Sequence, residues 1–209
     1  DADVVLVGIG VQPNVELAEQ AGLAIDNGIA VDECCRSSDP AILAAGDCCS
    51  FPYRGRRIRL ESVQNANDQA AAAAHTVAGK PLPYAALPWF WSDQYDHQLQ
   101  VAGEPALGTQ TVTRVLGEAA GGAQAELHFY LNAERRLVGV SGFGPLSTVA
   151  KELKLARMLV ERRAAPPAEQ LADPERGPRQ QRPAAGGDDP PLVGAPGEQG
   201  PHRECERHC

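Results

Sequence analysis

Two short apolar runs stand out in the first part of the chain. Residues 4–9 read VVLVGI without a polar position, and residues 41–47 read AILAAGD, ending in a glycine and a carboxylate. A continuous run of β-branched and aliphatic residues is typical of a strand buried on both faces of a sheet. We therefore predict a buried strand at each place. Gly8 and Gly10 at the end of the first run would allow backbone or ligand to approach closely.

Turn and capping residues predict a helix and a hairpin between these runs. Asn14 precedes the sequence VELAEQA at residues 15–21 and suits a helix N-cap, and Gly22 suits the end of that helix. Asn27 and Gly28 then lie between two β-rich arms. This dipeptide is a strong hairpin signal, so we predict a hairpin there.

A second helix is predicted at residues 60–79, LESVQNANDQAAAAAHTVAG. Its alanine run favours a helix, Ser62 suits the N-cap, and Gly79 suits the C-terminal stop. The basic segment before it, residues 52–59, contains turn residues and is predicted to form a loop.

The pattern changes at about residue 84, where alternation of apolar and polar positions begins. Residues 109–115, 125–131 and 136–143 are strand candidates, with a hairpin loop at NAERR between the last two. We predict an antiparallel meander of an α+β domain. It ends in a helix that Ser147 can cap, with one apolar face formed by Val149, Leu153, Ala156 and Val160.

These patterns divide the chain at two places. We expect one unit up to residue 83 and a second domain at residues 84–163. Residues 164–209 are rich in proline and glycine and poor in large apolar side chains. Such a segment cannot bury enough surface to offset its ordering entropy, so we predict that it is disordered.

The chain carries a net charge of −8, which argues against a general nucleic-acid binder. No apolar run approaches the roughly 20 residues that a membrane span needs, and no secretory signal is visible. We therefore expect neither nucleic acid nor a membrane as a partner, and a cytoplasmic location.

The chain has 6 cysteines, of which four form the adjacent pairs Cys34–Cys35 and Cys48–Cys49. Neighbouring Cα atoms lie about 3.8 Å apart, below the usual disulfide minimum of about 4.4 Å. The pairs also lack the spacing of a zinc site. We expect free thiols and no metal site, and a thiol or metal protein remains the alternative.

Two neighbouring features suit a bound ligand. Gly46 would leave room for it at the end of its strand, and the Asp47 carboxylate can accept hydrogen bonds from sugar-type hydroxyls. An aspartate at this place is also a common turn former. At the next helix start, the backbone N–H groups near Ser62, Val63 and Gln64 form a positive pole that suits an anion or the pyrimidine edge of a flavin. An ordinary capped helix is the alternative.

Aromatic and basic side chains form two further clusters. In an extended strand Trp89 and Trp91 face one way and Phe90 the other, so the two indoles can border an aromatic cofactor, line an interface or pack in a core. A basic run can steer an acidic partner, or can be a solvated hairpin. It consists of Arg54, Arg56, Arg57 and Arg59.

Taken in order, four segments resemble one family in sequence: VVLVGIGVQPNVELAEQAGL, NGIAVDECCRSSDPAILAAGDC, LESVQNANDQAAAAA and PWFWSDQYDHQLQVAG. They look like the C-terminal part of the FAD-dependent ferredoxin reductases of bacterial oxygenase systems, the putidaredoxin-reductase type of the pyridine nucleotide-disulfide oxidoreductases. The resemblance implies an α/β fold. It would comprise the end of an NAD domain at residues 1–11, the second FAD-domain segment of a glutathione-reductase-like flavoprotein at residues 12–83, and a small α+β C-terminal domain at residues 84–163.

The resemblance also implies roles. Electrons would pass from NAD(P)H through FAD to a [2Fe–2S] ferredoxin, which would dock near the basic run, with no protein side chain acting as a catalyst. Asp47 would hydrogen-bond the flavin, and Val63 would offer its N–H to the ring. Glu61 would lie near the nicotinamide, and Trp89 and Trp91 would border the ring.

The sequence departs from this family in two respects. The GxGxxG motif of the FAD domain and the NAD-binding glycines are absent, so we expect the chain alone to bind FAD poorly and to be inactive. The tail does not resemble the family, which suggests a frame slip in a GC-rich gene. A rubredoxin reductase, an apoptosis-inducing-factor-like flavoprotein, and a truncated chain without redox function remain alternatives.

Overall fold

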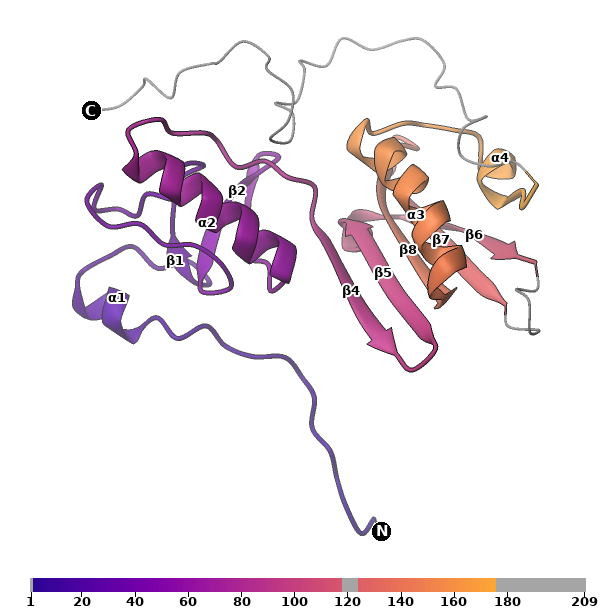
Figure 1. Cartoon of the computed structure of the whole chain (residues 1–209), viewed down its shortest axis with the longest axis horizontal. Helices are drawn as coiled ribbons and strands as arrows, with labels where there is room; N and C mark the ends of the chain where they lie inside the picture. The colour runs from indigo at the N-terminus through magenta and orange to yellow at the C-terminus, as the bar shows by residue number, and fades with distance from the viewer. Residues whose placement is uncertain (1, 118–123, 176–209) are drawn as a thin grey trace. The chain divides into compact units, whose positions relative to one another are not determined.

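The computed structural model describes residues 2–117 and 124–175, which divide into two compact units between Ala85 and Ala86 (Figure 1). The predicted boundary lies after residue 83. Most of the tail that we predict to be disordered lies outside the described residues.

The first unit contains two helices and a small sheet. The elements in chain order are α1 (Glu16–Gln20), β1 (Ile29–Ala30), β2 (Cys49–Tyr53), β3 (Arg56–Ile58) and α2 (Val63–Val77). In the sheet, β2 lies between β1, to which it is parallel, and β3, to which it is antiparallel. Arg54 at φ 48° and Gly55 at φ 82° join β2 to β3, which is the backbone of a tight type I′ hairpin turn.

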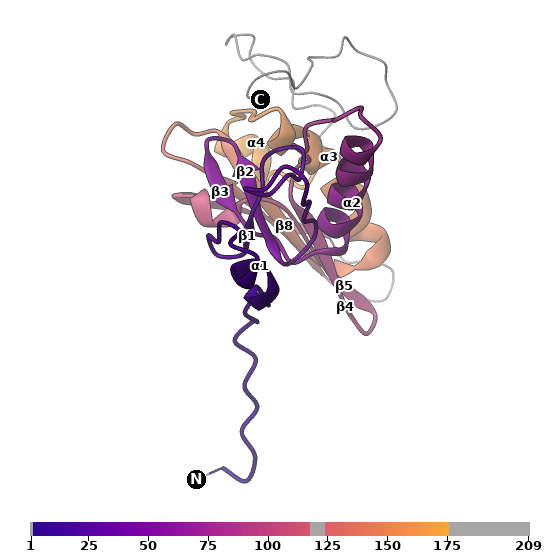
Figure 2. The ribbon, with the colours of Figure 1, turned by 90° about the vertical axis from the view of Figure 1, so that its left-hand side faces the viewer.

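The buried strand predicted at residues 4–9 is not present. This segment runs extended and exposed, and Leu6 is 93% exposed (Figure 2). A strand of this composition needs hydrogen-bonded neighbours at its edges and apolar layers on its faces. No strand pairs with it among the described residues, so the prediction is wrong for this structure.

The strand predicted at residues 41–47 is also wrong. The segment folds back on the residues before it instead, with Ser37 N–H donating to the Ile42 carbonyl at 2.9 Å and Ala44 N–H to the Cys35 carbonyl at 3.1 Å. The strand that pairs with β1 is β2, which follows the glycine–aspartate pair. The pair therefore lies in a turn that leads into a strand.

The turn at Asn27 and Gly28 is confirmed by their positive φ angles of 51° and 130°. Only an isolated bridge between Ile25 and Ile29 links its arms, so no extended hairpin forms. In α1 the N-cap position is Val15 without a side-chain bond, so the prediction for Asn14 is wrong.

The second unit is built on a sheet of 5 strands, all antiparallel. The strands are β4 (Trp89–Gln94), β5 (His97–Gly103), β6 (Gln110–Leu116), β7 (Ala125–Leu131) and β8 (Leu137–Pro145). A short 3₁₀ turn, η1 (Pro105–Leu107), follows β5. The strands predicted from alternation are confirmed, and β6, β7 and β8 form the predicted antiparallel meander. The sheet order is β4-β5-β8-β7-β6, because β8 inserts between β5 and β7.

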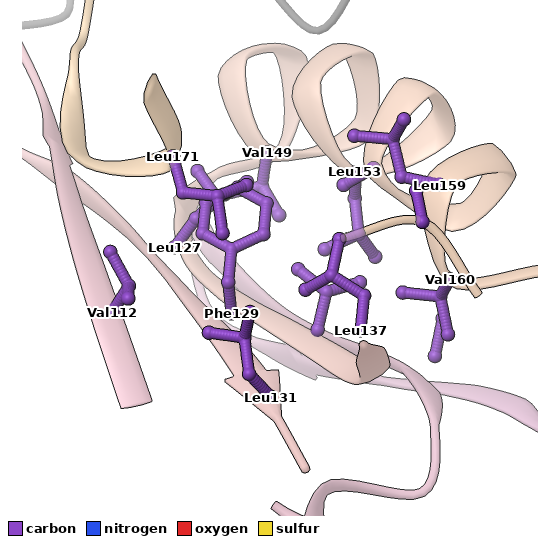
Figure 3. Packing of buried hydrophobic residues seen from close by; sticks show 14 of the residues in the cluster. Val112, Leu127, Phe129, Leu131, Leu137, Val149, Leu153, Leu159, Val160 and Leu171 are labelled. Carbon is purple, nitrogen blue, oxygen red and sulfur yellow. The ribbon is translucent and has the colours of Figure 1, made fainter. Parts of the chain in front are cut away.

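Helix α3 (Leu146–Glu161) covers one face of this sheet (Figure 1). The predicted apolar face is confirmed, because its four members are all 0% exposed: Val149, Leu153, Ala156 and Val160. They pack against Leu127, Phe129 and Leu137 of the sheet (Figure 3). Pro145 occupies the N-cap position and no side chain caps the helix, so the prediction for Ser147 is wrong.

Helix α4 (Ala168–Ala172) lies in the segment predicted to be disordered. Leu171 is fully buried in the core of the unit, and the Arg114 guanidinium of β6 donates to the carbonyls of Gln170 at 3.1 Å and Leu171 at 2.7 Å. The prediction of disorder is therefore wrong for residues 164–175, because one apolar side chain and a distant cation hold the helix. None of the helices in the described ranges is long and apolar enough to cross a membrane.

Candidate functional site

The turn at Gly46 and Asp47 packs against the first half of α2. Gly46 is buried with φ 87°, and its N–H donates to Gln69 Oε1 at 2.8 Å. A Cβ added at Gly46 would lie 3.6 Å from the Ala66 Cβ, which is ordinary contact. Glycine is therefore favoured here by its backbone conformation, and its role in leaving room for a ligand stays a prediction.

Asp47 is exposed, and its carboxylate has no hydrogen-bond or ion-pair partner in the part of the chain that the structure describes. Its backbone carbonyl accepts a hydrogen bond from Arg59 Nη1 at 3.2 Å. The same nitrogen pairs with the carboxylate of Glu61. One guanidinium therefore ties the turn to the residues that precede α2, and it leaves the Asp47 carboxylate available to a ligand.

The N-terminus of α2 offers two backbone donors beside this turn. The Ser62 hydroxyl caps the helix by accepting from Asn65 N–H at 3.2 Å, as predicted, and the Ser62 carbonyl accepts from Ala66 N–H at 3.0 Å. The N–H groups of Val63 and Gln64 have no acceptor among the described residues. Because Val63 is 60% exposed, this positive end of the helix is open to a ligand.

Sequence reasoning missed the polar face of α2 that holds the turn in place. Asn65 and Gln69 are fully buried, one helical turn apart. Asn65 Nδ2 donates to the Leu60 carbonyl at 3.1 Å, while Gln69 Oε1 accepts from Gly46 and from the Cys49 thiol at 2.9 Å. The signal was present in the sequence, since Asn65 and Gln69 stand four residues apart, before the alanine run, and so share one face of the helix.

Two buried amide atoms of this face lack partners in the described ranges: Asn65 Oδ1 and Gln69 Nε2. Unpaired buried polar groups are rare in native proteins and call for an explanation such as a ligand or ordered water. The turn, the helix terminus and these two atoms lie on the same half of α2. This part of the first unit is therefore the best candidate for a ligand site.

The cysteines beside the turn are poorly suited to thiol chemistry. Burial raises the pKa of Cys49 to about 12, with smaller contributions from Cys48 and Cys35. Burial also raises the pKa of Cys35 to about 11, helped by the nearby Asp32 carboxylate. Both thiols therefore stay protonated at neutral pH, whereas a nucleophile or metal ligand needs the thiolate.

Gly8 and Gly10 are not brought to this site. Both lie in the exposed extended segment, and a Cβ at either position would meet nothing within 4 Å. No other part of the described chain approaches either glycine closely. Gly10 adopts φ 88°, which favours glycine for its backbone freedom alone.

Trp89 and Trp91 belong to β4 of the second unit, and they face the same side as predicted. Their rings stack with centroids 4.9 Å apart and planes at 28°. Trp89 packs against the apolar core of the unit, while Trp91 is 37% exposed. The Arg157 guanidinium of α3 lies over the Trp89 ring, 4.9 Å from its centroid.

The four arginines of the basic run have different environments. Arg57 donates to the carbonyls of Val31 at 2.7 Å and Ser50 at 2.6 Å, and Arg59 is committed to the turn described above. Arg54 lies over the Tyr53 ring at 5.2 Å, in the tight turn that joins β2 to β3. The run is therefore not one continuous free patch.

Comparison with known proteins finds two family models that match separate parts of the chain. Residues 1–70 match the model of the pyridine nucleotide-disulphide oxidoreductases, and residues 89–180 match the model named Reductase C-terminal. The chain is therefore similar to part of a pyridine nucleotide-disulphide oxidoreductase. The fold expected from the resemblance, part of such a reductase followed by a C-terminal domain, is confirmed.

The curated relatives that this chain matches include ferredoxin reductases. It is 46% identical over 178 residues to the anthranilate 1,2-dioxygenase system ferredoxin–NAD(+) reductase component of Burkholderia cepacia, covering 84% of the chain and 42% of the relative. It is 51% identical over 115 residues to rhodocoxin reductase of Rhodococcus erythropolis, covering 54% of the chain and 27% of the relative. The chain thus spans less than half the length of these relatives.

Solved structures agree with this family. The ferredoxin reductase for the CYP199A2 system of Rhodopseudomonas palustris matches with a TM-score of 0.71 and 37% identity, over 85% of the chain and 42% of the reductase. The reductase in the covalent putidaredoxin reductase–putidaredoxin complex matches with a TM-score of 0.71 and 35% identity, over 86% of the chain and 41% of that chain.

Proposed function

We propose that this chain is part of a flavoprotein that transfers electrons from NAD(P)H through FAD to a ferredoxin that serves an oxygenase. The observation that carries the proposal is the convergence of an unpaired carboxylate and two free backbone donors at one end of α2. The relatives named above support the same activity.

The first unit fits the flavin on chemical grounds. The Asp47 carboxylate accepts hydrogen bonds from the hydroxyls of the ribityl chain, since no group of the described residues competes for it. The N–H of Val63 or Gln64 donates to the pyrimidine edge of the ring, where the positive end of α2 also favours the negative charge of the reduced form. Glu61, fixed by Arg59, borders the nicotinamide side.

When FAD is bound, it supplies the step that accepts electrons as a pair from the nicotinamide and passes them on singly. The residues of this chain bind and orient, and none of them needs to act as an acid, a base or a nucleophile. In the second unit, the exposed indole of Trp91 offers a flat apolar surface that can cover an aromatic ring and exclude water from it.

The partner in this proposal is a [2Fe–2S] ferredoxin of a cytoplasmic oxygenase system. A ferredoxin that presents acidic side chains would be steered by basic ones, because opposite charges accelerate encounter. Arg57 and Arg59 are held by internal contacts. We therefore assign the docking contribution of the basic run to Arg54, which is exposed at the β2–β3 turn.

The test uses a hybrid protein, because the relatives are longer than this chain. The chain is joined behind the part of the Burkholderia cepacia reductase component that it does not match. We expect the hybrid to purify with bound flavin and to reduce a [2Fe–2S] ferredoxin with NADH. A folded hybrid that carries flavin and oxidises NADH, but reduces no ferredoxin, would contradict the proposed acceptor. A folded hybrid without flavin would contradict the proposed site.

A further inference from the structure

The Trp89–Trp91 pair is contacted by a cation for which the sequence gives no reason. Arg157 extends from α3 and places its guanidinium 4.9 Å from the centroid of the Trp89 ring. The side chain is half-buried, and burial lowers the pKa of Arg157 despite the favourable charge of Glu161. An arginine in such a position gives up hydration, which strengthens its attraction to the electron-rich face of an indole.

The indole of Trp89, the inner ring of the pair, has few other contacts that fix its orientation. Its Nε1 atom is buried but has no hydrogen-bond partner in the described part of the chain. Buried tryptophan N–H groups ordinarily find an acceptor that fixes the ring. The orientation of Trp89 therefore depends on packing against the core, on the stacked Trp91 ring and on the Arg157 guanidinium.

We propose that Arg157 is a positioning residue for Trp91, acting through Trp89. The guanidinium fixes the inner ring, and the inner ring fixes the outer one by stacking. The exposed surface of Trp91 is thereby presented in one orientation to a flat aromatic ligand. The identification of this ligand as the flavin ring rests on the function proposed above. The contact between Arg157, Trp89 and Trp91 is independent of that function.

The planar shape of arginine matters for this role as much as its charge. A guanidinium can lie flat on an indole, whereas the ammonium of lysine is a compact and strongly hydrated point charge. We therefore expect lysine at position 157 to keep part of the effect and methionine, which keeps the apolar stem, to lose it. Lys154 provides a matched control, because it is an exposed cation on the same helix.

The experiment measures circular dichroism of the chain itself. The chain contains 2 tryptophans, so a far-ultraviolet exciton couplet between indoles reports on this pair alone. We expect Arg157→Met to reduce the couplet amplitude at least about twofold. Arg157→Lys should be intermediate and Lys154→Met unchanged. Trp91→Phe should abolish the couplet, which verifies the assignment.

The proposal is overturned if Arg157→Met retains the couplet of the unchanged chain. If that variant does not fold, as judged by its thermal transition, Arg157→Lys decides in its place, and a full couplet there overturns the planar contact. Flavin is absent from this measurement. A protein that fails to bind flavin but loses its couplet in Arg157→Met would refute the proposed function and leave this inference standing.

Discussion

Arg114 provides a sharp test of how the second unit is held together. Its side chain is 0% exposed, and it donates to the Leu171 and Gln170 carbonyls at the end of α4. Its Nη1 atom lies 3.6 Å from the Glu152 carboxylate of α3. The guanidinium thus joins β6, α3 and α4, and its removal should release α4 from the sheet.

The magnitude of the effect of Arg114→Met follows from these contacts. The variant loses two hydrogen bonds from a charged donor, each contributing about 1.5–3 kcal/mol, and leaves Glu152 without its cation. Methionine restores part of the buried apolar contact. Breaking a buried ion pair costs about 3–5 kcal/mol, and we expect the free energy of unfolding of this unit to fall by that amount.

The assay is urea denaturation followed by tryptophan fluorescence. Both tryptophans of the chain lie in β4, so the signal reports on the second unit. Arg162→Met, an exposed cation at the C-cap of α3, is the control and should change the free energy by less than about 0.5 kcal/mol. Hydrogen exchange at the amides of residues 168–172 should accelerate in Arg114→Met alone. If Arg114→Met is as stable as the control, the contacts to α4 contribute nothing and the reasoning is refuted.

Three further predictions concern the turn and its thiols. Gly46→Ala should destabilise the first unit by about 1–2 kcal/mol, because φ 87° at this position disfavours any side chain. Denaturation followed by the circular dichroism of the helix measures the change, and unchanged stability would contradict the predicted backbone strain. In the folded chain, iodoacetamide at pH 8 should modify the half-buried Cys48 before the buried Cys35 or Cys49. Peptide mass mapping would show the order, and equal rates at the three cysteines would contradict protection by burial. The contribution of the Cys49 thiol to the free energy of unfolding should be constant well below pH 8.5, which is about the pKa of the thiol in the unfolded chain. This contribution should fall as pH rises from there toward about 12, the raised pKa of Cys49 in the folded chain, because only the unfolded thiol ionises in this range. Denaturation at a series of pH values should show a smaller loss of stability in Cys49→Ala.

The second unit could be predicted from sequence more completely than the first. Alternation identified its strands, and helical spacing identified the face of α3 that is buried. The insertion of β8 between β5 and β7 could not be read from that pattern, because alternation specifies faces and not neighbours. The contact of Arg114 with α4 was equally hidden, since it joins residues more than fifty positions apart.

In the first unit, predictions from short-range signals such as caps and turns were confirmed, whereas the predicted buried strands, which depend on neighbouring strands, were wrong. The Ser62 cap and the turn at Asn27 and Gly28 follow from short-range chemistry, and the structure has both. The buried strand at residues 4–9 required neighbours that the described residues do not provide. At the candidate site, the role of Gly46 and Asp47 in binding a ligand stays a prediction. The buried amide of Gln69, which holds their turn in place, was not predicted.

The central claim is that Gly46–Asp47 and the start of α2 form the flavin site, and that the adjacent cysteines do not. Its most direct test is the flavin dissociation constant of the hybrid protein, measured by fluorescence for two neighbouring substitutions. We expect Asp47→Ala to weaken binding by about tenfold or more, the loss of a hydrogen bond to a charged group. Cys48→Ala should stay within about twofold of the unchanged hybrid. Unchanged binding in Asp47→Ala, with a loss in Cys48→Ala, would contradict the account.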